Sequence, residues 1–125
     1  MNKVNDYTNQ QANTLEELEA AVQGLLTSGW QPLGQVSTRI ETLDNGEQRR
    51  VYFQTLVGYE EIKGPHVISY RVMRSDNTTN LQNDVLPLIQ HEGWQPFGAM
   101  VASHEMFVYQ VLVQYGRKEQ NADAD

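Results

Sequence analysis

The 125-residue sequence predicts an α+β fold made of two tandem βαββ units, and two repeated patterns lead to this prediction. Residues 29–34 (GWQPLG) return as residues 93–98 (GWQPFG), each time after a Leu-x-x-x-Val pattern typical of a helix. Further along, residues 52–57 (YFQTLV) return as residues 108–113 (VYQVLV). The chain therefore contains two copies of one helix-and-hairpin unit.

The first helix is expected at residues 15–26. Thr14 is a suitable N-cap, and Glu17 three residues later completes a capping box. Leucine and valine recur at helical spacing on one face, while Glu16, Glu19 and Gln23 face away from it. A weaker candidate strand, residues 4–8, precedes this helix.

A hairpin is expected to follow the first helix. Residues 36–42 alternate apolar or β-branched with polar side chains, and residues 51–59 read as the returning strand. Between them, the Asp44-Asn45-Gly46 cluster favours a tight turn.

The second unit begins with a stronger strand, residues 67–73, after a Gly64-Pro65 break. Its helix, around residues 81–90, contains Pro87, so we expect either a cap at Asn83 or Asp84 or a bend at the proline. This helix should be shorter or less regular than the first. A shorter hairpin over residues 99–115 completes the unit.

These elements predict one mostly antiparallel sheet, or two half-sheets related by pseudo-twofold symmetry, with both helices on one face. The boundaries are residues 1–63 for the first unit and 64–118 for the second, within one compact domain. Residues 119–125 form an acidic tail that we expect to be disordered, because it has no large apolar side chain to bury.

One face of the long strands is more apolar than a solvent-exposed face should be. It carries Tyr52, Leu56, Val108 and Leu112. We expect a second copy of the chain to cover it, giving a dimer or a larger ring, and a sheet that curls over itself is the alternative.

Composition excludes several classes of function. The net charge of −7 disfavours binding to duplex nucleic acid, and the chain has no cysteine for disulfides or thiol catalysis. No apolar run is long enough for a membrane helix, and the N-terminus is too polar for a signal peptide. We therefore expect a soluble, cytoplasmic protein without a membrane partner.

The repeated Gly-Trp-Gln-Pro-x-Gly segments, each between a Leu-x-x-x-Val helix and an aromatic-Gln strand, resemble a small bacterial and bacteriophage domain family of unknown function. Units of that family usually begin with a Tyr-x-Val-Val strand, which residues 70–73 (YRVM) match and the first unit lacks. The resemblance implies a compact βαββ module, often found in phage genomes, that acts by binding. It implies no catalytic residue.

The sequence offers few catalytic arrangements. Its three histidines are His66, His91 and His104. Ser103-His104-Glu105 has the residue types of a hydrolytic triad, but neighbours on a strand point to opposite faces, so a turn is the better interpretation. We therefore predict no catalytic residue, no metal and no cofactor.

The two tryptophans permit two interpretations. An aromatic plate beside an arginine can hold a nucleobase, but a residue repeated directly after each helix end is usually a packing element. We favour packing, and assign a structural role to the repeated set Gly29, Trp30, Pro32, Gly34, Gly93, Trp94, Pro96 and Gly98.

Six of the nine basic residues lie between residues 39 and 74, and they are not duplicated between the units. If the first hairpin lies near the strand of the second unit, the arginines among them converge on a small phosphate-bearing ligand. The predicted ligand-binding residues are Arg39, Arg50, Tyr52, Arg71 and Met73. The alternative is that the arginines are surface charges that neutralise Glu41, Glu47 and Glu60.

Together these features predict a non-catalytic homo-oligomeric binding protein, plausibly encoded by a phage. It would sequester a small anionic, nucleotide-derived signal and so disarm a host defence. The alternative is an adaptor or inhibitor that binds a host protein without any small ligand. A small enzyme using His66 or His104 is a third option.

Overall fold

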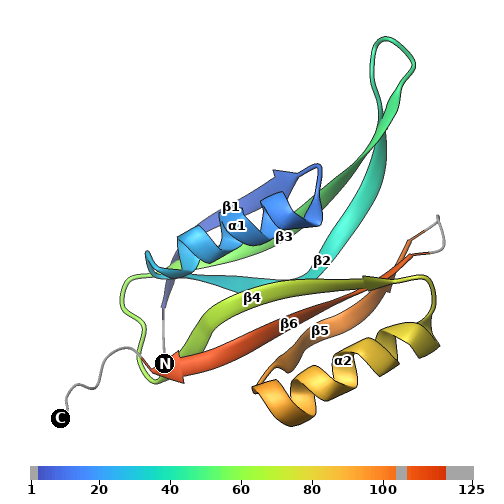
Figure 1. Ribbon diagram of the computed structural model, residues 1–125. Helices are drawn as coiled ribbons and strands as arrows, with labels where there is room; N and C mark the ends of the chain where they lie inside the picture. The colour runs from blue at the N-terminus through green and yellow to red at the C-terminus, as the bar shows by residue number, and fades with distance from the viewer. Residues whose placement is uncertain (1–2, 104–106, 118–125) are drawn as a thin grey trace.

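A computed structural model describes residues 3–103 and 107–117 (Figure 1). In this part of the chain the fold is α+β, with six strands in two three-stranded antiparallel sheets and two helices. The predicted acidic tail, together with His104 and Glu105 of the predicted turn, lies outside the described residues. No helix in the described part is long and apolar enough to cross a membrane.

The two units have the same order of elements and the same strand order. In the first unit, β1 (Val4–Ala12), α1 (Leu15–Leu26), β2 (Trp30–Thr42) and β3 (Gln48–Tyr59) form a sheet of order β1-β3-β2. In the second unit, β4 (Pro65–Ser75), α2 (Thr78–Glu92), β5 (Gln95–Ala102) and β6 (Val108–Arg117) form a sheet of order β4-β6-β5.

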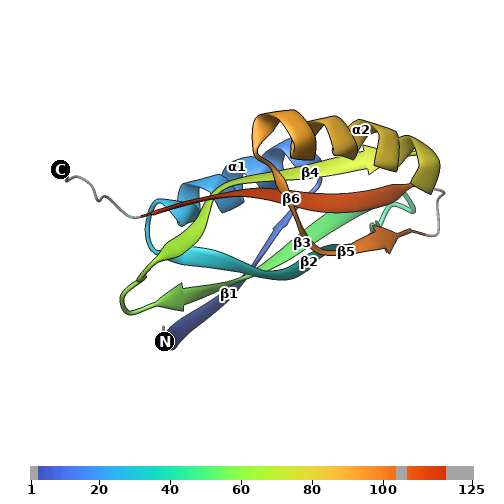
Figure 2. The same cartoon turned by 90° about the horizontal axis from the view of Figure 1, so that it is seen from below.

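The packing between the two units is not reciprocal. Helix α1 packs against β4 of the other unit as well as against its own sheet, whereas α2 packs against β4 and β6 of its own unit. Figure 2 shows α2 and β1 on opposite sides of the molecule. These contacts therefore lend no support to the predicted twofold axis.

Helix α1 confirms the predicted N-terminus. The Thr14 hydroxyl accepts a hydrogen bond from the backbone N–H of Glu17 at 3.1 Å, as expected of an N-cap. The apolar stripe is buried at Leu15, Leu18, Val22 and Leu26.

Helix α2 is longer than predicted. It begins at Thr78, where the Asn77 side chain accepts from the N–H of Asn80 at 2.8 Å, and it has 15 residues against 12 in α1. The predicted caps at Asn83 or Asp84 are therefore wrong. Pro87 lies within the helix on an exposed position, where water can satisfy the carbonyl that loses its partner.

Strand β2 begins six residues earlier than predicted, at Trp30, and Pro32 lies inside the strand. The register with β3 shifts between Leu33 and Ser37, forming a bulge in which Gly34 has a φ of 73°. The amide of Gln54 on β3 donates to the carbonyls of Leu33 and Gly34 at 3.3 and 3.0 Å.

The second unit repeats this bulge. Strand β5 shifts register between Phe97 and Val101, Gly98 also has a φ of 73°, and the Gln110 amide donates to the Gly98 carbonyl at 3.1 Å. The repeated glycine and the repeated glutamine of the sequence therefore serve the same backbone irregularity, because the glutamine satisfies carbonyls that the strand ladder leaves unpaired.

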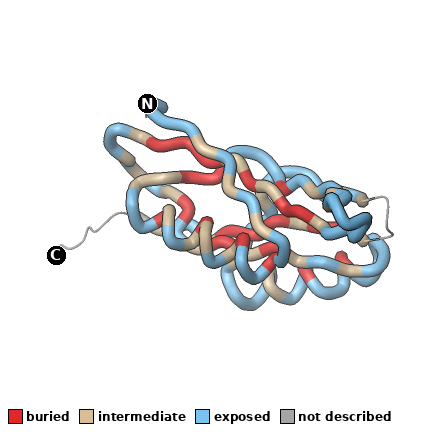
Figure 3. Tube along the Cα trace, turned by 90° about the horizontal axis from the view of Figure 1, so that it is seen from above, coloured by how far each residue is buried: buried red, intermediate tan, exposed pale blue. Residues whose placement is uncertain are grey.

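The apolar strand face expected to need a second copy is covered within the chain (Figure 3). Tyr52 and Leu56 are buried in a core cluster with α1 and the second sheet, and Val108 and Leu112 are buried in a cluster with α2. The prediction of a second copy on this face is therefore wrong. The half of the face on the first unit is buried between the units, because β4 and β6 pack over it beside α1, and the half on the second unit is buried under α2.

Strand β4 is an edge strand whose outer backbone groups are satisfied by side chains of the first unit. Val67 donates its N–H to Oε1 of Gln31 at 2.7 Å and accepts from its Nε2 at 3.0 Å. Further along, the N–H of Val72 donates to the Glu19 carboxylate at 2.7 Å.

Between these two points, Gln23 of α1 makes a second two-bond contact. Its amide donates to the carbonyl of Ile68 at 2.8 Å and accepts from the N–H of Tyr70 at 3.1 Å. Glu19 and Gln23, predicted to face away from the core, instead close the edge of the second sheet. Because these outer backbone groups of β4 are occupied, they are not free to pair with another strand.

Candidate ligand cavity between α1 and β4

A cavity of about 420 Å³ lies where the first turn of α1 faces β4. This volume is within the range of small-molecule sites. It is lined by Asn13, Thr14, Leu15, Glu16, Glu19, Tyr52, Arg71, Val72, Met73 and Arg74. Residues from both units build it, so the cavity exists only because the units pack together. We call it the α1–β4 cavity.

The structure brings together three of the five predicted ligand-binding residues. Tyr52, Arg71 and Met73 all line the α1–β4 cavity. Arg39 and Arg50 instead line a separate cavity of about 170 Å³ between β2, β3 and the end of β5. The predicted convergence of Arg39, Arg50 and Arg71 on one cavity is therefore wrong, because the β2–β3 hairpin places Arg39 (on β2) and Arg50 (on β3) beside the second hairpin rather than beside β4.

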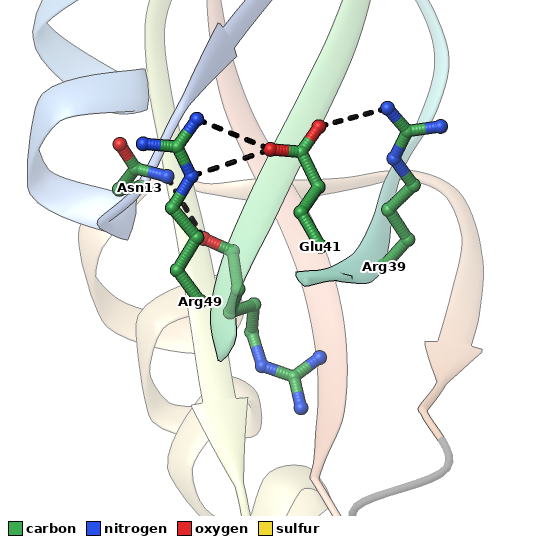
Figure 4. Close-up of polar contacts among 5 residues, drawn as sticks. Asn13, Arg39, Glu41 and Arg49 are labelled. Carbon is green, nitrogen blue, oxygen red and sulfur yellow. Dashed lines mark hydrogen bonds and ion pairs between the residues drawn. The ribbon is translucent and has the colours of Figure 1, made fainter. Parts of the chain in front are cut away.

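Arg39 and Arg49 are engaged with a carboxylate on the surface (Figure 4). Glu41 lies between them and accepts from Arg39 at 2.9 Å and from Arg49 at 3.2 Å. These two guanidiniums hold the pKa of Glu41 below its ordinary value. For Arg39 the structure therefore agrees with the alternative interpretation, in which this arginine neutralises Glu41 at the surface. The Asn13 amide, seen beside this cluster, donates to the Arg50 carbonyl at 3.2 Å.

Two arginines of β4 lie at the cavity, and each also lies over an aromatic ring. The guanidinium carbon of Arg71 is 5.8 Å from the Trp94 ring centroid, and that of Arg74 is 4.8 Å from the Phe107 centroid. Stacking of this kind fixes a guanidinium while leaving its N–H groups available to a ligand. The sequence identified Arg74 only as one of the clustered basic residues.

Two carboxylates line the same cavity, and no sequence pattern indicated them. Glu16 is exposed in the first turn of α1. Glu19 is half-buried, and this burial raises its pKa, while the Val72 N–H and the Arg71 charge act in the opposite direction. A helical pattern marks both residues only as polar, so their position at a cavity depends on where β4 lies.

The floor of this region carries a pair of tyrosines. Tyr52 and Tyr109 meet edge to face with ring centroids 5.7 Å apart, and both are buried. Burial, and then the Tyr52 hydroxyl, raise the pKa of Tyr109 to about 12, although the Arg50 and Arg74 charges oppose this. Tyr109 therefore stays protonated at neutral pH.

The tryptophans act as packing elements at both repeats. Trp30 packs against the main core cluster, and Trp94 packs against the cluster under α2. The four glycines of the repeated segments, namely Gly29, Gly34, Gly93 and Gly98, all have positive φ. Pro32 is buried in β2, whereas its counterpart Pro96 is exposed.

The two histidines of the described part lie apart from each other, and His66 lines a separate cavity of about 350 Å³ together with Tyr59, Glu60 and Glu61. His66 Nδ1 lies 3.1 Å from the Gly64 carbonyl, and His91 is exposed in the last turn of α2. Ser103 accompanies the predicted turn, since its N–H donates to the Phe107 carbonyl at 2.9 Å. Within residues 3–103 and 107–117, no three His, Asp or Glu side chains are grouped closely enough to hold a metal ion.

No protein-family model, curated protein sequence or solved structure matches this chain significantly.

Proposed function

We propose that this chain is a non-catalytic binding protein that holds a small nucleotide-derived anion in the α1–β4 cavity. The observation that carries the proposal is the pairing in one cavity of two guanidiniums, Arg71 and Arg74, with two carboxylates, Glu16 and Glu19. Guanidiniums recognise phosphate oxygens through paired hydrogen bonds, and carboxylates accept hydrogen bonds from ribose hydroxyls. A ligand carrying both groups satisfies all four side chains.

The remaining lining residues suit the same class of ligand. Asn13 and Thr14 supply polar groups at the start of α1, and Met73 and Val72 supply an apolar wall. An inorganic anion alone would leave the two carboxylates facing its charge. The carboxylates therefore favour a nucleotide over free phosphate.

The proposal is tested by isothermal titration calorimetry with AMP, cyclic AMP, ADP-ribose, NAD and inorganic phosphate. We expect heat of binding from at least one nucleotide and none from phosphate. Arg71→Ala and Arg74→Ala should each weaken the binding about tenfold or more, corresponding to the loss of one charged hydrogen-bonding group. Glu16→Gln should weaken the binding of ribose-containing ligands while leaving the fold unchanged.

Arg39→Ala is the matched control, because this arginine is exposed and lies outside the cavity. It should bind like the wild type. Absence of heat with every nucleotide would overturn the proposal. Capture of a host protein by a chain that binds no nucleotide would favour the adaptor function instead.

A further inference from the structure

The first and second units differ in which surfaces are covered, although their strands pair in the same way. Val4 lies opposite Tyr59 and Val67 opposite Tyr115, and in both sheets the register shifts directly after this pair. Tyr7 lies opposite Val57 and Tyr70 opposite Val113. Position by position, Val4 of β1 therefore corresponds to Val67 of β4, and Tyr7 corresponds to Tyr70.

These corresponding residues have opposite environments. Val67 and Tyr70 are 3% and 5% exposed because β4 is seated on the first unit, whereas Val4 and Tyr7 are 49% and 61% exposed. The same contrast holds on β2 and β5: Leu33 is 54% exposed, whereas its counterpart Phe97 packs against the core. At these two positions β1 thus carries the same kind of side chain that β4 buries, but nothing in the described chain covers them; at the third position Asn9 replaces the buried Val72.

The surface on which β4 packs in the first unit also has a counterpart in the second unit. In the first unit it includes Leu18, Val22, Val36 and Gln54, which are all fully buried beneath the second sheet. In the second unit the corresponding residues line an open groove of about 240 Å³ between α2, β5 and β6. The groove is lined by Thr78, Leu81, Gln82, Val85, Met100 and Gln110. Met100, the counterpart of Val36, is 40% exposed.

We infer that a second copy of this chain seats its β1 in this groove, repeating between chains the contact that β4 makes within one chain. The same chain does not supply the strand, because β1 and α2 lie on opposite sides of the molecule (Figures 1 and 2). Each copy donates one β1 and receives another, so the contacts run head to tail. We expect them to close into a ring, of which a dimer is the smallest, because an open row of copies would leave one groove and one β1 uncovered at its ends.

Hydrogen-bonding groups at the groove match those of the internal contact. Within the chain, the Tyr70 hydroxyl donates to Oε1 of Gln54 at 2.6 Å, while the Gln54 amide holds the bulge of β2. Gln110 holds the bulge of β5 with its amide in the same way. Its Oε1 is therefore the acceptor for the hydroxyl of Tyr7 from the second copy.

The two-bond contact of Gln31 with the Val67 backbone also has a counterpart. Gln95 occupies the position of Gln31 in the second repeat and is exposed. It is placed to bind the Val4 backbone of the second copy. Three positions depart from the internal contact. Asn9 of β1 replaces the buried Val72, Gln82 of α2 replaces Glu19, and Leu86 replaces Gln23, the partner of the Tyr70 N–H. On β1 the N–H of Tyr7 is already satisfied by Oδ1 of Asp6 at 2.9 Å, so an apolar residue suits that position.

This surface is separate from the α1–β4 cavity, so the inference does not depend on ligand binding. Multi-angle light scattering over a range of concentrations measures the mass of the full chain. We expect a closed oligomer for the wild type, and single chains for Tyr7→Glu and for Met100→Glu. Tyr115→Glu is the matched control, since Tyr115 is 50% exposed and lies outside both surfaces. It should keep the wild-type mass.

The decisive experiment mixes the two disrupted variants. Tyr7→Glu retains an intact groove and Met100→Glu retains an intact β1, so a head-to-tail contact predicts that they form a one-to-one pair. A symmetric contact that uses both residues on each side predicts no pairing. A wild type that stays monomeric at every concentration, or variants that keep the wild-type mass, would overturn the inference. Far-ultraviolet circular dichroism checks that each variant is folded.

Discussion

At the scale of single residues, the repeated sequence motif is explained by backbone chemistry. Gly34 and Gly98 each take a positive φ at a bulge, and a glutamine on the neighbouring strand donates to the carbonyl of that glycine. These positions are therefore fixed by the hydrogen bonds of an irregular strand and need no ligand to account for them.

Two of these glycines differ in their surroundings and allow a matched comparison. A Cβ added to Gly98 would lie 3.1 Å from the backbone nitrogen of Gln35, whereas nothing lies within 4 Å of a Cβ added to Gly34. Gly34→Ala should cost about 1–2 kcal/mol for the left-handed conformation alone. Gly98→Ala should cost roughly 1–3 kcal/mol more, because β2 and β5 must move apart.

Urea denaturation of both variants measures this difference in the free energy of unfolding. Equal losses would show that the contact between β2 and β5 is looser than the structure indicates.

At the scale of secondary-structure elements, the notable pairing is that of a helix with a strand edge. Side chains of α1 hydrogen-bond to the outer backbone groups of β4, in place of a neighbouring strand. The link between the units is therefore polar as well as apolar. The bonds between Gln31 and Val67 are buried, so breaking them would leave backbone groups without a partner, whereas those of Gln23 and Glu19 are partly open to water.

Glu19 makes this link dependent on pH. Its pKa is raised above the ordinary value of 4.5 by burial, so its contribution to stability is greatest below pH 4.5 and is lost as the pH rises through its pKa in the folded state. Glu19→Gln cannot titrate at this position. The free energy of unfolding of the wild type, relative to Glu19→Gln, should therefore fall with rising pH and then level off.

Urea denaturation of the two proteins over a series of pH values gives this difference, in which the titration of groups that do not interact with Glu19 cancels. A difference that grew with pH would mean that the Val72 N–H and Arg71 outweigh burial at Glu19.

At the scale of the whole molecule, the two units share one core. Tyr70, Val72 and Val111 of the second sheet lie in the same cluster as Leu18 and Leu56 of the first unit. A fragment of residues 1–63 would expose that face to water. With so small a remaining core, the fragment should not fold by itself.

We expect the isolated fragment to show no cooperative thermal transition by circular dichroism. Addition of a fragment of residues 64–125 should restore one, since it supplies the missing sheet. A cooperative transition in residues 1–63 alone would show that each unit is an independent domain.

Local sequence signals account for most of the secondary-structure elements. Thr14, the helical stripe of α1 and the Asp44-Asn45-Gly46 turn are local signals, and each lies where the structure has the corresponding cap, helix or hairpin. Such signals are reliable because capping and side-chain periodicity depend on a few neighbouring residues. The start of α2 differs from the prediction, which depends on Pro87 alone, because Asn77 caps the helix six or seven residues before the caps expected at Asn83 or Asp84.

Only the tertiary structure decided which surfaces meet. The sequence identified the face with Tyr52 and Leu56 as apolar but not its cover, which is the second unit of the same chain. It likewise predicted that Glu19 faces outward and that Arg39 lies with Arg71. In the structure Glu19 bonds to β4, and Arg39 lines a separate cavity beside the second hairpin. The periodicity of a segment indicates whether its backbone is helical or extended and which of its faces is apolar. It carries no information about which distant segment packs there, because that choice depends on contacts between residues far apart in the chain.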